Sequence, residues 1–353
     1  MSNPTPHYYP IFASVPLVLT FVSEPAATWY ECQNRDTSGG EECFEGIVRM
    51  SQSVKPRVAV IGLGSMGFGM ATSLHRAGFD VTGCDISAET AARFVREGGK
   101  SATTPAEAAS NADIVVSVVL NAAQTDSILF GRNGVAETLP KDAVFMSCAT
   151  MDPEAARRLA SQLEATGRHY LDAPISGGAQ RAAQGQLTIL ASGSATAFAK
   201  ARPALDAMAA KLYELGDKAG LGAAFKMVNQ LLAGVHIVAA SEAITFAARQ
   251  GLDIGKVYEV ITASAGNSWM FENRMPQVLK GDYTPRSAVE IFVKDLGIVQ
   301  DMARTARFPA PLSAAALQMF LAAAGAGMGR DDDASIARMY ARMSGTALPG
   351  ETK

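Results

Sequence analysis

Short apolar runs alternate with amphipathic stretches from residue 57 to about residue 216. The stretches 88–97, 105–110 and 153–166 have the spacing of apolar and polar positions that is typical of helices. Strands that alternate with helices predict a mostly parallel sheet with helices on both faces. In such sheets, ligands bind outside the carboxyl ends of the strands. The runs that we expect to be strands are residues 58–61, 81–84, 114–119, 144–147, 170–173, 187–191 and 212–215.

The pattern changes after residues 216–222, and no further strand signal follows. Residues 223–250 are almost all helix formers with apolar positions on every side, so we expect one long helix that is buried all round. Further helical segments cover residues 257–263, 271–279, 288–305, 312–324 and 334–343. The sequence therefore predicts an α/β domain over residues 56–218, joined by a long helix to an all-α domain over residues 219–346, with residues 347–353 as a tail.

Residues 1–55 do not follow either pattern. The apolar segment 11–22 is short and is interrupted by Pro16, so it does not predict a membrane span. No Lys or Arg precedes Arg35, so the basic region of a signal peptide is missing. We expect residues 1–55 to be a leader that is disordered or not native, with translation starting at Met50.

Composition excludes several classes of function. The chain has 353 residues and a net charge of −3, so no basic field attracts nucleic acid or an anionic membrane. Its four cysteines do not form a disulfide framework, and Cys84 and Cys148 fall at predicted strand ends, which suits a reducing, cytoplasmic compartment. Cys32 and Cys43 have no partners at metal-ligand spacing, so no metal is expected.

The first strand is followed by a glycine-rich turn and a helical pattern. The turn matches G-x-G-x-x-G, and an acidic residue, Asp85, follows the next strand 18 residues after the last glycine. The glycines permit the tight turn, the approach of a pyrophosphate and the close packing of helix on strand. A carboxylate at Asp85 can accept hydrogen bonds from the ribose hydroxyls and would repel a 2′-phosphate, so the motif predicts NAD rather than NADP. The turn consists of Gly62, Leu63, Gly64, Ser65, Met66 and Gly67.

Lys226 and Asn229 lie three residues apart on the long apolar helix and thus on one face of it. A lysine buried among apolar residues must be paired or have a lowered pKa, which suits proton transfer near neutral pH. A lysine near a helix start can equally keep its ammonium in solvent.

Other candidate residues follow predicted strands or lie on later helices. Ser176, Gly177 and Gly178 offer consecutive N–H groups and a hydroxyl, which form either a nest for a small carboxylate or an ordinary turn. Thr150 either caps the next helix or meets a nicotinamide. Lys294 either pairs with Asp295 at the surface or reaches the nicotinamide and substrate. Leu120 and Asn121 end another strand, near where a ribose would lie, and residues 266–273 are dense in polar and aromatic groups.

Four blocks in this order, GLGSMG, DAPISGG, KMVNQ and FVKDLG, resemble the β-hydroxyacid dehydrogenases over residues 57–345. The resemblance implies a Rossmann-type N-terminal domain, a helical C-terminal domain and an active site in the cleft between them. It also implies that Lys226 is the catalytic acid/base, that Asn229 holds substrate, and that Ser176–Gly178 bind its carboxylate. Lys294 would lie near the nicotinamide. The chain departs from the usual pattern at Ala149-Thr150 and at Leu120, and neither position touches the proposed chemistry.

Four further blocks, QLLAGVHIVAASEA, AGNSWMFENRM, GDYTPRSAVEIFVKDLG and FPAPL, resemble a branch of this family that acts on four-carbon sugar acids. The resemblance implies NAD-dependent oxidation of such an acid by a homodimer or homotetramer. The alternative substrates are 3-hydroxyisobutyrate and tartronate semialdehyde. A 6-phosphogluconate dehydrogenase is disfavoured, since the loop after Asp172 has no basic cluster beyond Arg181. A non-enzymatic NAD-binding scaffold is disfavoured by the presence of Lys226.

Overall fold

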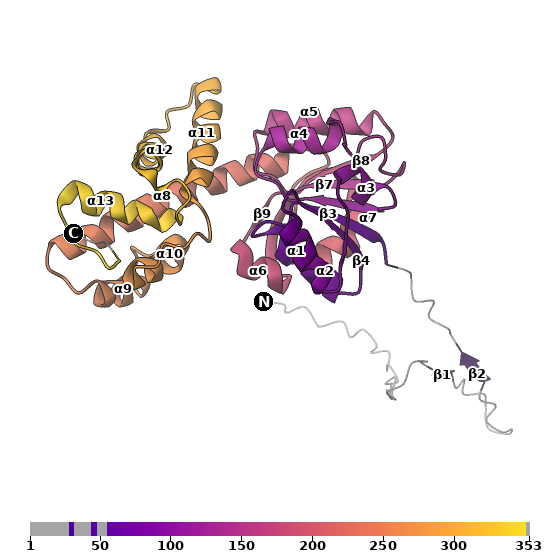
Figure 1. The fold of residues 1–353 in the computed structure, drawn as a ribbon, viewed down its shortest axis with the longest axis horizontal. Helices are drawn as coiled ribbons and strands as arrows, with labels where there is room; N and C mark the ends of the chain where they lie inside the picture. Colours follow the sequence, from indigo (N-terminus) through magenta and orange to yellow (C-terminus); the bar gives the residue numbers. More distant parts are fainter. Residues whose placement is uncertain (1–27, 32–43, 48–54, 351–353) are drawn as a thin grey trace, which may run out of the picture. The chain divides into compact units, whose positions relative to one another are not determined.

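The structure is a computed structural model that describes residues 28–31, 44–47 and 55–350. The chain divides into two units, residues 1–54 and 55–353. In the first unit, β1 (Thr28–Glu31) pairs antiparallel with β2 (Phe44–Ile47) (Figure 1). Apart from Lys55, the rest of the expected leader, including Met50, lies outside the described residues, so the expectation of a start at Met50 stays a prediction.

A six-stranded parallel sheet forms the centre of the first half of the second unit. Its strand order is β5-β4-β3-β6-β7-β8, so the order of the strands reverses between β3 and β6. The central strands β6 and β7 are buried along their whole length, which explains why they appear as continuous apolar runs rather than alternating ones. The strands are β3 (Arg57–Ile61), β4 (Asp80–Cys84), β5 (Lys100–Ser101), β6 (Ile114–Ser117), β7 (Val144–Ser147) and β8 (His169–Asp172).

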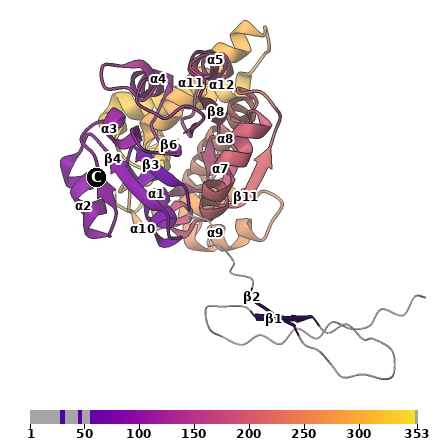
Figure 2. The same ribbon diagram turned by 90° about the vertical axis from the view of Figure 1, so that its right-hand side faces the viewer.

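Helices cover both faces of this sheet, as predicted (Figures 1 and 2). One face packs on α1 (Gly67–Arg76), α6 (Gly178–Gln184) and α7 (Ala195–Met208), with Phe94 of α2 (Ala88–Arg96). The other face packs on α3 (Pro105–Ala109), α4 (Ala122–Phe130) and α5 (Pro153–Glu164). This arrangement leaves the carboxyl ends of the strands open at one edge.

The last two strands that we expected do not join the parallel sheet. β10 (Leu187–Ala191) lies between β11 (Ala209–Glu214), to which it is parallel, and β9 (Ile175–Ser176), to which it is antiparallel. They form a separate three-stranded sheet. An apolar run specifies that a strand is buried and does not specify its partner, so the sequence pattern could not separate the two sheets.

A single helix of 29 residues, α8 (Leu221–Arg249), follows the second sheet. Its first turn is held by the buried carboxylate of Asp172, which accepts hydrogen bonds from the N–H groups of Gly220 (2.9 Å) and Ala223 (2.8 Å). These N–H groups have no partner within the helix, so Asp172 acts as its cap from the end of β8. The cap fixes where the long helix leaves the sheet.

The remaining helices pack on the distal part of α8 in two apolar clusters, one around Ile237 and one around Ile244. Among residues 55–350 no strand follows β11, as predicted. The change from strands and helices to helices alone occurs near the predicted boundary at residue 218. The elements are α9 (Ile254–Thr262), α10 (Trp269–Lys280), α11 (Val289–Thr305), α12 (Pro311–Ala323), η1 (Ala324–Met328), η2 (Asp333–Ser335) and α13 (Ile336–Ser344).

The expectation that α8 is buried on all sides is wrong. Leu221, Phe225, Val228 and Leu232 are between 38% and 63% exposed, and they follow one another at the spacing of one helix face. We call these four residues the exposed apolar face of α8. Both α8 and Pro311–Met328 are long and apolar enough to cross a membrane, although half of the most apolar window of α8 is buried inside the protein. The cores cover only the other sides of α8, and helix composition does not reveal which side is covered.

Candidate active site

A cleft of about 610 Å³ opens at the carboxyl edge of the parallel sheet and extends to α8, α10 and α11. The residues that line it come from seven separate stretches of the chain. Four of these stretches follow β3, β6, β7 and β8, because parallel strands bring the loops that follow them to the same edge. Of the predicted site residues, Gly62, Leu63, Asp85 and Asn121 do not line the cleft. Those that line it are Gly64, Ser65, Met66, Gly67, Leu120, Thr150, Ser176, Gly177, Gly178, Lys226, Asn229 and Lys294.

The glycine turn has the geometry that a dinucleotide requires. A side chain at Gly67 would place its Cβ 1.8 Å from the carbonyl oxygen of Gly62, so only glycine lets α1 start this close to β3. Gly62 has a φ of +91°, which favours glycine. At Gly64, by contrast, a Cβ would meet nothing within 4 Å, and this open space faces the cleft. The backbone there is accessible to a pyrophosphate, so the turn fits NAD.

Asp85 lies at the end of β4, beside the glycine turn. Its carboxylate accepts hydrogen bonds from the backbone N–H groups of Leu63 (2.6 Å) and Ser87 (2.8 Å). A carboxylate has about four acceptor positions, so about two remain for hydroxyl groups. Asp85 is therefore tied to the glycine turn and keeps acceptor capacity.

Two consecutive glycines lie in the loop after β8. Gly177 and Gly178 have φ values of +139° and +80°, a region in which residues with a side chain are strained. Ser176 precedes them in β9, where it pairs with Thr188. All three line the cleft, so the loop is available to a small anion.

Lys226 lies in the cleft wall with only 7% of its surface exposed, which rules out the alternative of a solvent-facing lysine. Its Nζ donates to the carbonyl oxygen of Ile175 at 2.8 Å, directly before the Ser176–Gly178 loop. Burial lowers the pKa of Lys226 from 10.5 to about 8; the negative charge of Asp295 raises it and the positive charge of Lys294 lowers it further. A neutral amine is therefore accessible near physiological pH.

Lys294 has features of both alternatives considered for it. Its ammonium donates to the carboxylate of Asp295 and to the carbonyl oxygen of Thr150 (3.2 Å), and it also lines the cleft. Asp295 is 1% exposed, so this ion pair is at the cleft wall rather than at the surface. Thr150 does not cap α5, because Asp152 does so by accepting from the N–H groups of Glu154 and Ala155.

Two residues near the cleft have simpler roles in the fold. The side chain of Asn121 accepts from the N–H of Gln124 (2.9 Å) and so caps α4. Cys148 lines the cleft, but burial raises the pKa of its thiol to about 12, so it stays protonated. Leu120, which precedes Asn121, lines the cleft and is 58% exposed.

Sequence reasoning missed several polar residues of the cleft. Gln230 donates to Asp295 at 2.5 Å. Arg274 donates to both carboxylate oxygens of Asp333 (2.5 and 3.0 Å), while Arg286 pairs with Asp282 (3.2 Å). The position of Asp295 beside Lys294 and the close spacing of Asp282 and Arg286 offered the only signals, since the partners of Gln230 and Arg274 are far away in the chain.

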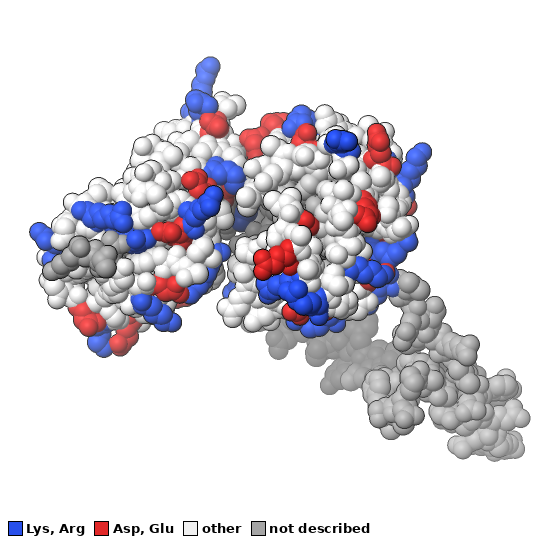
Figure 3. Space-filling view, viewed as in Figure 1, with Lys and Arg blue, Asp and Glu red and all other residues white. Residues whose placement is uncertain are grey.

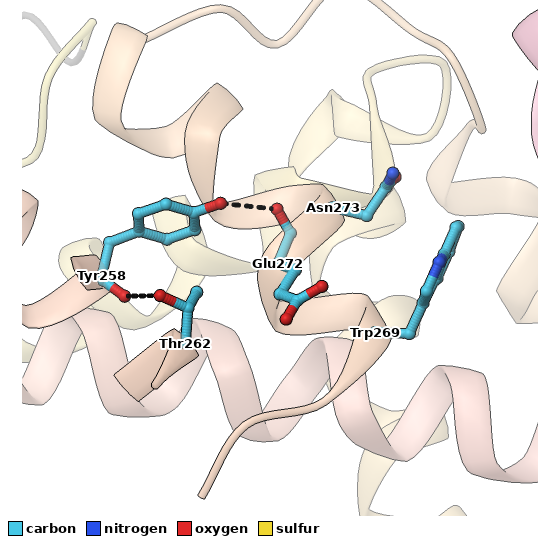
Figure 4. Close-up of a pocket in the computed structure, with 5 residues that line it drawn as sticks. All are labelled: Tyr258, Thr262, Trp269, Glu272 and Asn273. Atoms are coloured by element: carbon cyan, nitrogen blue, oxygen red, sulfur yellow. Dashed lines mark hydrogen bonds between the residues drawn. The ribbon is translucent and has the colours of Figure 1, made fainter. Parts of the chain in front are cut away.

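A smaller pocket of about 330 Å³ lies next to the cleft, and Trp269 and Asn273 belong to both. Figure 4 shows Tyr258 and Thr262 on one side of this pocket and Trp269 and Asn273, from the start of α10, on the other. The hydroxyl of Tyr258 donates to the carbonyl oxygen of Glu272 at 3.1 Å. The predicted polar and aromatic segment 266–273 thus forms part of the cleft wall.

On the face in Figure 3, Lys and Arg side chains are interspersed with Asp and Glu rather than gathered in one basic patch. Within residues 55–350 no group of three or more His, Cys, Asp or Glu residues could hold a metal ion.

Comparison with known families identifies the class of protein that this fold and cleft define. Residues 57–216 match the NAD binding domain of 6-phosphogluconate dehydrogenase, and residues 220–340 match the family described as NAD-binding of NADP-dependent 3-hydroxyisobutyrate dehydrogenase. The chain belongs to the β-hydroxyacid dehydrogenase family and is an NAD-dependent hydroxyacid dehydrogenase. The predicted fold class, family and cofactor are therefore confirmed.

Two relatives and one solved structure show how similar the chain is to individual members of the family. The chain is 51% identical over 296 residues to an L-threonate dehydrogenase of Cupriavidus necator, an alignment that covers 84% of this chain and 99% of the relative. It is 47% identical to the L-threonate dehydrogenase of Pectobacterium atrosepticum, with 83% and 95% covered. A crystal structure described as 3-hydroxyisobutyrate dehydrogenase from Salmonella typhimurium has a TM-score of 0.78 and 46% identity, and covers 81% of this chain and 100% of that one.

Proposed function

We propose that the chain oxidises L-threonate to 2-oxo-tetronate (2-dehydro-L-erythronate) with NAD⁺, and that Lys226 is the general acid/base. The substrate is supported by the relatives named L-threonate dehydrogenase, which are 45–51% identical over most of the chain. We further propose that residues 56–218 bind the cofactor and that residues 219–346 complete the substrate site.

One observation carries this proposal: a buried lysine with a pKa of about 8 lies in the same cleft as an open glycine turn and a glycine loop. The substrate carboxylate binds the N–H groups of Ser176, Gly177 and Gly178. Neutral Lys226 accepts the proton of the reacting hydroxyl at Nζ while the C–H bond of that carbon breaks. When bound, NAD⁺ accepts the hydride. Asn229, on the same face of α8, holds the substrate beside Lys226. In the reverse direction the Lys226 ammonium returns the proton.

Cofactor binding is assigned to the glycine turn and the loops beside it. The backbone from Gly62 to Gly67, including Leu63, Ser65 and Met66, holds the pyrophosphate at the start of α1. Asp85 accepts from the ribose hydroxyls and repels a 2′-phosphate, which favours NAD over NADP. Leu120, Asn121, Thr150 and Lys294 contact the remainder of the cofactor; for Asn121 this means its backbone, since its side chain caps α4.

Lys226→Ala tests the role of the amine. We expect it to abolish turnover of L-threonate and to leave NADH binding, measured by fluorescence titration, nearly unchanged. Lys211→Ala, which changes an exposed lysine, is the control. If Lys226→Ala kept most of the activity, Lys226 would not be the acid/base.

A panel of hydroxy acids, assayed with NAD⁺ and NADP⁺ by NADH or NADPH absorbance, tests the substrate. The second candidate is 3-hydroxyisobutyrate, which the match of residues 220–340 and the similar Salmonella structure favour. Tartronate semialdehyde is tested in the reductive direction. A kcat/KM for either compound above that for L-threonate would reassign the substrate without changing the class of enzyme.

We also propose that the enzyme works in the cytoplasm as a homodimer or homotetramer. The exposed apolar face of α8 supports self-association, because apolar helix faces of this kind are typical of homodimer interfaces. Leu232→Asp should lower the mass in analytical ultracentrifugation. Val260→Asp, at a 51% exposed apolar residue on α9, is the matched control. An unchanged mass in Leu232→Asp would place the interface elsewhere.

A further inference from the structure

Asp295 is a nearly fully buried carboxylate in the wall of the cleft, with 1% of its surface exposed. One of its oxygens accepts from the ammonium of Lys294, and the other accepts from Nε2 of Gln230 at 2.5 Å. Gln230 is itself 7% exposed and lies on α8, one helical turn after Lys226. Asp295 therefore joins α11 to the segment of α8 that carries the acid/base.

The hydrogen bonds continue from Gln230 to Asn229 in a fixed direction. An ionised carboxylate can only accept, so Gln230 must turn its NH₂ group toward Asp295. Its Oε1 then faces Asn229 and accepts from Nδ2 of Asn229 at 2.9 Å. Within residues 55–350, these bonds leave Oδ1 of Asn229 without a donor, and Asn229 lines the cleft. Asn229 thus has an acceptor atom available to a ligand in the cleft.

We infer that Asp295 is a positioning residue that acts through Gln230: it orients the Asn229 amide so that Oδ1 accepts a hydrogen bond from a substrate hydroxyl other than the one that is oxidised. This inference rests on the proposed function, because it takes Lys226 as the base. The reacting hydroxyl has a single proton, and Lys226 takes it. An acceptor at Asn229 therefore needs the proton of a second hydroxyl, and a carbonyl or carboxylate has none to give. The cleft selects a polyhydroxy acid over an acid with one hydroxyl.

Gln230→Met tests the relay, because methionine keeps the length of the side chain and removes both hydrogen bonds. The kinetics are compared for L-threonate and for 2-hydroxybutanoate, which keeps the carboxylate and the 2-hydroxyl and lacks the others. 2-Hydroxybutanoate is measured as an alternative substrate or as a competitive inhibitor. We expect the KM for L-threonate to rise about tenfold. The KM or inhibition constant of 2-hydroxybutanoate, the KM for NAD⁺ and kcat for L-threonate should each change less than about twofold.

Two further variants separate positioning from general damage to the fold. In Asp295→Asn the new amide can donate to Oε1 of Gln230, and Gln230 can then donate to Oδ1 of Asn229. Asn229 would present its NH₂ group to the cleft instead of an acceptor. We expect a similar loss of selectivity for L-threonate. Gln300→Met is the matched control, since Gln300 on α11 donates to Ser313 at 2.7 Å and does not line the cleft. It should leave the selectivity unchanged.

Equal losses for L-threonate and 2-hydroxybutanoate, or no loss for either, would overturn the inference. Failure of the proposed function gives a different result, because the wild-type enzyme would then not turn over L-threonate at all. The comparison is then made with the hydroxy acid that the panel identifies and with its analogue lacking the non-reacting hydroxyl. If that substrate has no second hydroxyl, the inference is wrong.

Discussion

The buried amine of Lys226 is needed for the proposed proton transfer but destabilises the fold. Lys226→Met should therefore make the folded protein more stable while it removes activity. Burial lowers the pKa of Lys226 from 10.5 to about 8, so at neutral pH the fold holds an ammonium in a site that disfavours it. The difference between these values corresponds to about 3 kcal/mol. Methionine carries no charge but gives up the hydrogen bond to Ile175, which contributes about 1 kcal/mol. We therefore expect the free energy of unfolding to rise by about 2 kcal/mol at pH 7.

The sign of the pH dependence gives the sharper test. Between about pH 8 and pH 10.5 the unfolded chain keeps the proton on Lys226 and the folded chain releases it, so wild-type stability rises with pH in this range. Lys226→Met has no such proton, and its advantage should therefore fall by about 2 kcal/mol between about pH 7 and pH 9.5.

Urea unfolding of both proteins at the two pH values measures this change, with Lys211→Met as the control at an exposed lysine. An advantage that did not depend on pH, or a loss of stability at pH 7, would refute the assignment of a strongly lowered pKa to Lys226.

Four other outcomes follow from the site and its supports. Because only neutral Lys226 accepts a proton, kcat/KM for oxidation should rise about tenfold per pH unit below about pH 8 and level off above it; a flat profile from about pH 6 to pH 9 would exclude the mechanism. Asp85→Ser should change the ratio of kcat/KM for NAD⁺ and NADP⁺ by about tenfold toward NADP⁺, since it removes the like charge that faces a 2′-phosphate; an unchanged ratio counts against Asp85 as the selector. Gly64→Ala should keep the melting temperature and weaken NADH binding in fluorescence titrations, whereas Gly67→Ala should lower the melting temperature, because its Cβ would lie 1.8 Å from a carbonyl oxygen; the reverse pattern would contradict the geometry of the turn. Asp172→Ala should lower the free energy of unfolding in urea by about 1–3 kcal/mol because it leaves buried N–H groups at the start of α8 unpaired; no change would mean that another group caps the helix.

The elements that depend on local pattern could be predicted from the sequence. β3, the glycine turn and α1 are consecutive in the chain, and Gly67 is required by a contact within the turn itself, with the carbonyl oxygen of Gly62. The position of Asp85 beside the glycine turn was also predictable, because the carboxyl ends of parallel strands meet at one edge of the sheet. The strands of the parallel sheet appeared as apolar runs because both of their faces are buried.

The candidate site was only partly predictable. The apolar neighbours of Lys226 indicated a buried lysine, but a lysine whose ammonium reached solvent had the same sequence pattern. The tertiary structure excludes that alternative, because α8 packs against the loop after β8 and Lys226 donates to the carbonyl oxygen of Ile175 there. Thr150 shows the same limit: its position before α5 suggested a cap, and the neighbouring Asp152 provides it instead.

The sequence by itself determined the order of strands and helices, the dinucleotide turn and the residue types available at the edge of the sheet. These features depend on residues that are close together in the sequence. Only the tertiary structure decided which side of α8 stays exposed and that Asp295, 65 residues further along the chain, meets Gln230. Such contacts form between elements that pack together, and the pattern along one element does not specify which partner it meets.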